Sequence, residues 1–231
     1  MEGFTGQFLA LGLVWYLAFL LSITVHEAAH AWSAWKLGDP TAYLGGQVTL
    51  NPIPHIRREP FGTVVVPLVS YALAGWVMGW ASAPYNPQWS ARYPKRAAWM
   101  AAAGPASNFV LAIMAGILIR SGISLGWLSP GSPGFDSFVV AAEGGPMQVA
   151  AAMLSILFSL NLLLGVFNLF PIPPLDGHAV LPLFLPEKWA AAYSDWMRQP
   201  MLSLVGLVVA WRLIGTVFYP LWWGALKLLL G

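Results

Sequence analysis

The sequence predicts an all-α polytopic membrane protein: a transmembrane helix bundle with a short β-hairpin or re-entrant strand after the first helix. Of the 231 residues, 58% are hydrophobic and only 9% are charged, whereas soluble domains carry roughly a quarter charged residues. Several apolar stretches also approach the roughly 20 residues that a helix needs to cross a bilayer. We therefore expect residues 1–231 to form a single integral-membrane domain.

The composition also excludes several classes of function. The net charge of +2 is too small and too scattered for binding to nucleic acid. The chain has no Cys, which excludes thiolate metal sites, disulfides and a cysteine nucleophile. Its 13 Trp and 7 Tyr fit the aromatic belts found where a protein meets the two surfaces of a lipid bilayer.

Four stretches are predicted to be long helices. The first covers residues 4–37 and ends before Gly38 and Pro40, a pair typical of a helix C-terminus. The others are predicted over residues 97–119, 147–170 and 201–218.

The stretch 42–56 has a different pattern. Tyr43, Val48 and Leu50 favour strands, and prolines at positions 52 and 54 argue against a helix there. We expect either an interfacial hairpin or a re-entrant strand, because irregular backbone at membrane depth must be buried in protein or reached by water.

A metal-binding pattern lies in the first predicted helix. His26, Glu27 and His30 form the motif HExxH. Residues four apart share a helix face, so both imidazoles can bind one ion, and the adjacent carboxylate can take a proton from an activated water. Ionisable residues inside an apolar helix are costly and usually functional.

A catalytic zinc site needs a third protein ligand. The best candidate is Asp176, at the end of the motif over residues 168–177, although an Asp-Gly pair after prolines is also a common turn. Asn168 can either stabilise an oxyanion or hydrogen-bond between helices. His55 and His178 lie in turns and can be ligands or simple hydrogen-bonding residues, whereas Asn108 is expected to hold helices together.

Four motifs carry a family resemblance: HEAAH from His26, NPIPH from Asn51, GPASN from Gly104 and NLFPIPPLDG from Asn168. In this order, over roughly residues 20 to 180, the chain resembles the site-2 protease family of intramembrane zinc metalloproteases. Arg57 departs from the pattern, because family members often carry an acid after the NPxPH histidine.

The resemblance implies one Zn²⁺ per chain, held by His26, His30 and Asp176, with Glu27 as the catalytic carboxylate and Asn168 close to the reaction centre. It also implies that the substrate is a transmembrane protein, such as an anti-sigma factor or a membrane-tethered regulator. Because the chain has no room for a PDZ or CBS domain, we expect a minimal-core member.

The metal site constrains the topology. Asp176 can meet His26 and His30 only if residues 61–80 make no net crossing, for example as a broken or re-entrant segment at Pro67. The basic residues then lie on one side, which the positive-inside rule makes cytoplasmic; they are Arg92, Lys95, Arg96, Lys188 and Arg198. We expect a bacterial or archaeal cell membrane, with the active site toward the cytoplasmic face.

The sequence therefore predicts an intramembrane zinc endopeptidase. One alternative is a non-catalytic membrane protein that binds metal, but such a protein has no need of a base at Glu27. The other is a transporter, which the absence of an evident internal repeat argues against.

Overall fold

The computed structural model describes residues 6–197 and 199–231, and it confirms the predicted all-α class. Within these residues, four helices are long and apolar enough to cross a membrane. They are α1 (Gly6–Leu37), α6 (Pro94–Ser124), α7 (Met147–Asn168) and α10 (Pro200–Leu230). Positions 4 and 5 of the first predicted helix lie outside the described residues. The last helix runs well past the predicted end at residue 218.

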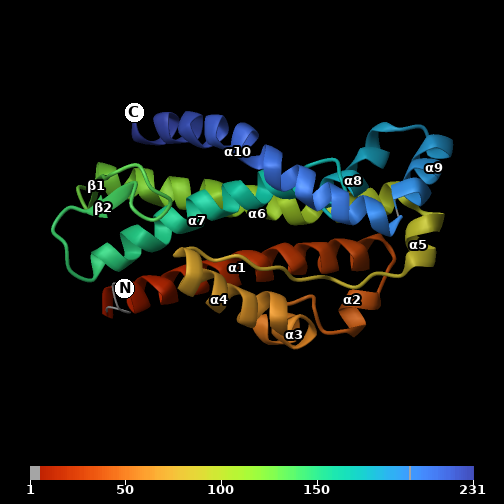
Figure 1. Ribbon diagram of the computed structural model, residues 1–231, viewed down its shortest axis with the longest axis horizontal. Helices are drawn as coiled ribbons and strands as arrows, with labels where there is room; N and C mark the ends of the chain where they lie inside the picture. The colour runs from red at the N-terminus through yellow and green to blue at the C-terminus, as the bar shows by residue number, and fades with distance from the viewer. Residues whose placement is uncertain (1–5, 198) are drawn as a thin grey trace.

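The bundle is built on α6, which packs against both α1 and α7 (Figure 1). Small buried residues on α6, including Ala101, Gly104 and Ala112, permit this close helix packing. The outer surface of the bundle is apolar as well. On α1, a stripe at Leu9, Leu13, Leu17 and Leu21 is 45–59% exposed, as expected of a helix that faces lipid.

The prediction of a strand over residues 42–56 was wrong. This stretch contains two short helices, α2 (Thr41–Leu44) and α3 (Pro52–Arg58). Asn51 caps α3, because its side chain accepts a hydrogen bond from the Ile53 N–H at 3.0 Å. Proline is tolerated in a first helical turn, where an N–H has no helical partner in any case. Asn-Pro here therefore starts a helix.

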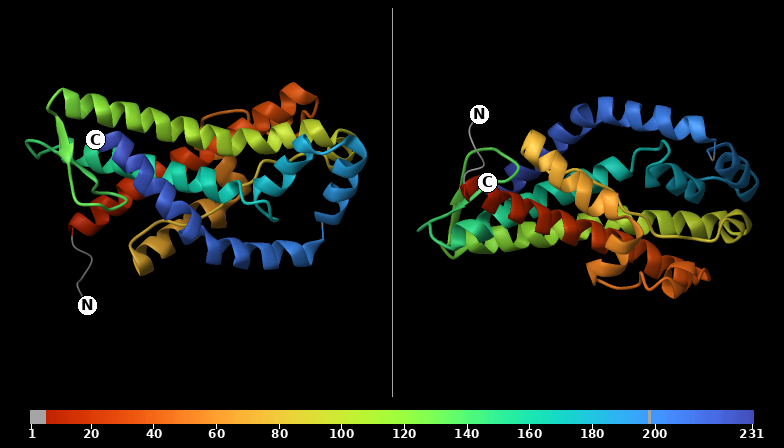
Figure 2. Two further views of the ribbon diagram at one scale, coloured as in Figure 1. Left: turned by 90° about the horizontal axis from the view of Figure 1, so that it is seen from above. Right: turned by 60° about the horizontal axis from the view of Figure 1, so that its bottom comes forward.

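A two-stranded antiparallel hairpin is present, but it lies between α6 and α7. Its strands are β1 (Leu128–Pro130) and β2 (Val139–Ala141). The views in Figures 1 and 2 place it at one end of the bundle. At the opposite end lie α5 (Pro87–Arg92) and α9 (Glu187–Met197).

The segment 61–80 turns back on itself, as the topology argument required. A π-helical turn (Phe61–Val65) leads directly into α4 (Val66–Ala74). The chain then reverses at Gly75, whose φ of 73° favours glycine. The Trp80 N–H donates to Gly62 O at 3.0 Å, so both ends of the segment meet.

Of the two forms expected at Pro67, a broken or a re-entrant segment, the break does not occur, and the chain reverses at Gly75 instead. Pro67 lies at the start of α4, immediately after the wider π-helical turn, and the helix continues through it.

After the reversal, residues 77–86 form an extended strap along α1. Gly79 lies against Phe19 near one end, and at the other end the Asn86 N–H donates to Asp39 Oδ2 at 2.7 Å. The HExxH residues lie between these two points of contact, the first on α1 and the second just after its C-terminal end. The strap therefore passes along the part of α1 that carries the motif (Figure 1).

Candidate metal centre

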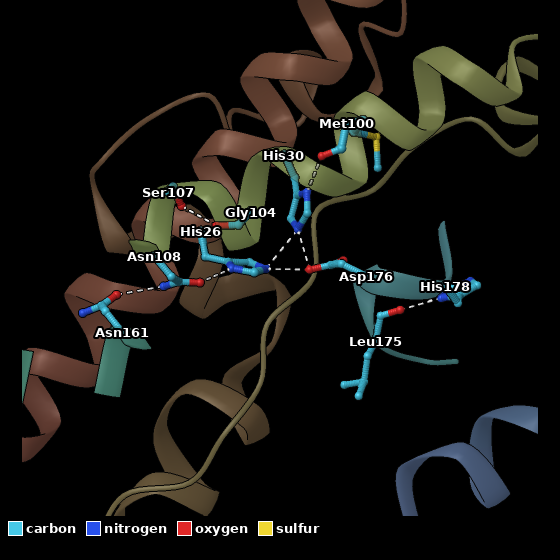
Figure 3. A network of polar contacts seen from close by, with 10 residues as sticks. All are labelled: His26, His30, Met100, Gly104, Ser107, Asn108, Asn161, Leu175, Asp176 and His178. Atoms are coloured by element: carbon cyan, nitrogen blue, oxygen red, sulfur yellow. Dashed lines mark hydrogen bonds and ion pairs between the residues drawn. The ribbon is translucent and has the colours of Figure 1, made fainter. Parts of the chain in front are cut away.

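Three predicted ligands converge in the bundle. His26 and His30 lie one turn apart on α1, and Asp176 is the first residue of α8 (Asp176–Val180). The two Nε2 atoms are 3.0 Å apart, and Asp176 Oδ2 lies 3.1 Å from His26 Nε2 and 3.2 Å from His30 Nε2 (Figure 3). Both histidines are buried, and Asp176 is partly exposed.

The loop after α7 brings Asp176 to this point. Leu175 packs in a small cluster with Phe170 and with Ala210 of α10, which anchors the start of α8. Gly177 lies directly against the backbone carbonyls of Leu169 and Phe170, where a side chain would collide with the main chain. Glycine is therefore needed immediately after the carboxylate.

Residues on α6 hold the outer edges of both imidazole rings. His30 Nδ1 is 2.8 Å from the backbone carbonyl of Met100, and His26 Nδ1 is 2.6 Å from Asn108 Oδ1. A carbonyl oxygen only accepts, so His30 carries its proton on Nδ1 and turns a bare Nε2 lone pair toward Asp176. A hydrogen bond from the ring nitrogen that does not face the metal is typical of histidine metal ligands.

The three converging atoms fit a zinc ion. Ligand atoms on a tetrahedron with bonds of 2.0–2.1 Å are about 3.3 Å apart, close to the separations found here. A carboxylate oxygen and two imidazole nitrogens are ordinary zinc ligands. The Asp176 carboxylate lies beside the two imidazoles, and these three residues form a group able to hold one metal ion.

The comparisons with known proteins agree with this geometry. The sequence profile of peptidase family M50 matches residues 14–211. The chain belongs to peptidase family M50. A relative from Bacillus subtilis, named "Putative zinc metalloprotease YwhC", is 35% identical over 173 residues, which cover 74% of this chain and 68% of that protein. Two proteins named "Putative zinc metalloprotease Rip2" are also similar: the one from Mycolicibacterium smegmatis is 28% identical and that from Mycobacterium tuberculosis 29%, each covering 88% of this chain and 70% of its own length. No solved structure matches significantly.

Membership of M50 confirms the resemblance to site-2 proteases. The chain is a zinc metalloendopeptidase of the membrane, and Zn²⁺ is its cofactor. The two alternatives drawn from the sequence, a transporter and a non-catalytic metal-binding protein, are thereby set aside.

The other candidate residues of the M50 site do not belong to the metal group found among the described residues. Glu27 is buried and follows His26 directly in α1. Asn168 is the last residue of α7, and its side chain has no hydrogen bond within the described part of the chain. Its catalytic role remains a prediction. His55 bonds to Thr49 O and His178 to Leu175 O, and neither belongs to the metal group.

Sequence reasoning missed the importance of Gly104. A Cβ at this position would overlap His30 Nε2 and would lie 2.6 Å from His26 Nε2, in the space where a metal ion would bind. Met100, Gly104 and Asn108 are four residues apart, so the three contacts lie on one face of α6. The four-residue spacing of Gly104 and Asn108 in the GPASN motif was the sequence feature that could have indicated this role.

We expect Gly104→Ala to abolish most zinc binding, because its methyl group would occupy the metal position. The matched control is Gly116→Ala in the same helix, whose Cβ would meet nothing closer than Phe158 at 3.4 Å. The measurement is zinc content of both purified proteins by elemental analysis. Full zinc occupancy in Gly104→Ala would show that the metal does not bind between the two histidines and α6.

Proposed function

We propose that this M50 protein is an intramembrane endopeptidase that cuts a transmembrane helix of another membrane protein, as in regulated intramembrane proteolysis. The observation that carries this proposal is the position of the metal group. His26 and His30 are buried within α1, a helix long and apolar enough to span a bilayer. A peptide bond hydrolysed there has to come from a segment that also enters the membrane.

In the proposed mechanism, His26, His30 and Asp176 hold the zinc ion. Zinc in such a site lowers the pKa of water to about 7 and polarises a carbonyl oxygen. Glu27 accepts the proton of the attacking water and passes it to the leaving amine. Asn168 is proposed to donate a hydrogen bond to the developing oxyanion.

A helical substrate must unwind locally, because its backbone groups are hydrogen-bonded within the helix. The strap over residues 77–86, and not the stretch 42–56, offers extended backbone beside the motif. Within the described residues, the N–H groups of Ala81 and Ala83 have no hydrogen-bond partner. We propose that an unwound substrate pairs with this edge by strand addition.

The test is cleavage of matched single-span substrates by detergent-purified protein. One substrate carries a Gly-Pro pair in the middle of its span, and the other carries Leu-Ala there and stays helical. Cleavage of the first within its span is expected, with little cleavage of the second. Cleavage confined to soluble flanking segments would contradict an intramembrane function. An anti-sigma factor or a membrane-tethered regulator is the proposed natural substrate class.

We also propose that the metal centre lies toward the cytoplasmic side of a bacterial or archaeal cell membrane. Arg92 ends α5 and Lys95 and Arg96 begin α6, at the end of the bundle to which the C-terminal half of α1 points. Lys188 is on α9 at the same end, whereas Asp136 and Glu143 lie in or near the hairpin at the other end. Arg198 lies outside the described residues. The positive-inside rule then orients the chain.

Because the natural chain has no Cys, an introduced cysteine is the only thiol of this protein that can be labelled, and its labelling reports the topology. We expect Glu143→Cys to react with a membrane-impermeant maleimide on intact cells, and Gln88→Cys to react only after the cells are opened. Both positions are exposed in the structure. Labelling of Gln88→Cys from outside intact cells would reverse the proposed orientation.

A further inference from the structure

A series of hydrogen bonds between buried side chains runs from His26 into the core of the bundle. Asn108 Nδ2 donates to Asn161 Oδ1 at 2.8 Å, and Asn161 Nδ2 donates to Ser22 Oγ at 2.8 Å and to Leu157 O at 2.9 Å. Ser22 Oγ donates to Ala18 O at 2.6 Å. Figure 3 shows Asn161, Asn108 and His26 in one line. The side chains of Ser22, Asn108 and Asn161 are fully buried, so water does not substitute for these bonds.

Two backbone carbonyls fix the direction of every hydrogen bond in this series. Leu157 O and Ala18 O can only accept hydrogen bonds. Asn161 must therefore turn its NH₂ group toward Leu157, which leaves its Oδ1 facing Asn108. The NH₂ group of Asn108 must face that oxygen, which in turn leaves Asn108 Oδ1 facing His26. The orientation of each amide follows from its neighbour.

The final bond, between Asn108 Oδ1 and His26 Nδ1, is 2.6 Å long. Because Asn108 offers only an acceptor here, the proton of a neutral His26 has to be on Nδ1, and the lone pair has to be on Nε2. Nε2 is the atom that faces His30 and Asp176. A flipped Asn108 would favour the opposite tautomer, whose Nε2 proton would block a metal ion.

We propose that Asn161 is a positioning residue for the metal centre: through Asn108, it selects the His26 tautomer that can bind zinc. The proposal rests on the proposed role of His26 as a zinc ligand. Among the described residues, Asn161 makes no hydrogen bond to a proposed metal ligand, and it acts from a third helix, α7. His30 needs no such series of hydrogen bonds, because the backbone carbonyl of Met100 sets its tautomer directly.

A purely structural role for Asn161 predicts the opposite response to two substitutions. Leucine is well suited to a buried position in a membrane bundle, whereas an aspartate carries a charge into the core. If Asn161 only packs, Asn161→Leu is tolerated and Asn161→Asp is damaging. If Asn161 orients Asn108, Asn161→Asp keeps the acceptor that Asn108 needs and Asn161→Leu removes it.

The experiment measures ¹⁵N chemical shifts of histidine side chains in zinc-stripped, detergent-purified protein. The chain has only four His, and the signals of His55 and His178 are assigned with His55→Gln and His178→Gln. We expect the Nδ1–H tautomer at both His26 and His30 in the natural protein. In Asn161→Leu, His26 alone should lose this preference, with His30 as the internal reference. Asn161→Asp should retain it.

Zinc affinity, measured by competition with a chelator, provides the second readout. We expect a loss of about 10- to 100-fold in Asn161→Leu, typical of removing support behind a metal ligand, and a smaller loss in Asn161→Asp. The matched control is Ser159→Ala on α7, which also removes a buried side-chain hydrogen bond, the one that Trp222 donates. An equal loss in Ser159→Ala would indicate general loosening and overturn the proposal.

An Nε2–H tautomer of His26 in the zinc-free natural protein would overturn the proposal even if no variant folds. The spectra are recorded in the absence of zinc and substrate, so this outcome is distinct from a failure of the proposed protease function. That function fails if substitution of His26 leaves zinc binding and cleavage unchanged.

Discussion

Glu27→Gln is expected to keep its zinc and to lose turnover by about 10²- to 10⁴-fold, the usual cost of removing a general acid–base group. Glutamine has nearly the same size as glutamate and can still hydrogen-bond to water, but it cannot accept a proton. The three proposed metal ligands are unchanged, and Glu27 does not belong to their group. A single-span substrate should therefore bind and stay uncut.

Zinc content and substrate cleavage should be measured on the same purified batch. The control is Glu143→Gln, which changes an exposed glutamate at the far end of the bundle and should leave both values unchanged. Cleavage by Glu27→Gln at the natural rate would eliminate Glu27 as the base. Loss of zinc together with activity would instead make this residue a ligand or a structural support.

His26→Ala, His30→Ala and Asp176→Asn are each expected to weaken zinc binding by at least about 100-fold. Each removes or neutralises one of three groups whose ligand atoms lie 3.0–3.2 Å apart, and loss of residues behind a ligand already costs about 10- to 100-fold. Chelator competition on purified protein gives the affinity. Activity should fall in parallel, because the proposed reaction depends on the bound metal.

His178→Gln is the control for Asp176→Asn, because His178 lies two residues away and bonds only to Leu175 O among the described residues. It should bind zinc normally. If Asp176→Asn also retains full zinc occupancy, Asp176 is not a ligand, and the third protein ligand has to be sought elsewhere.

The local sequence was sufficient to predict the long helices and the motif on α1. Apolar stretches of this length have few alternatives in a bilayer, where each backbone group must be bonded within the chain. The four-residue spacing of His26 and His30 places both on one helix face regardless of the rest of the fold. By contrast, the prolines at 52 and 54 were misinterpreted, because a proline that breaks a helix and one that begins it differ only in position relative to a cap such as Asn51.

What the sequence by itself determined is the chemistry: an HExxH helix in an apolar chain, and a distant carboxylate at Asp176. What only the tertiary structure decided is which residues support that chemistry. Gly104 matters because its missing side chain leaves space between two histidines of another helix, and Asn161 because its amide orients Asn108 across an interface. Contacts of this kind join residues 50 to 150 positions apart, and local patterns carry no information about them. They arise because close packing of α1, α6 and α7 excludes water and leaves each buried polar group only the partners that its neighbours present.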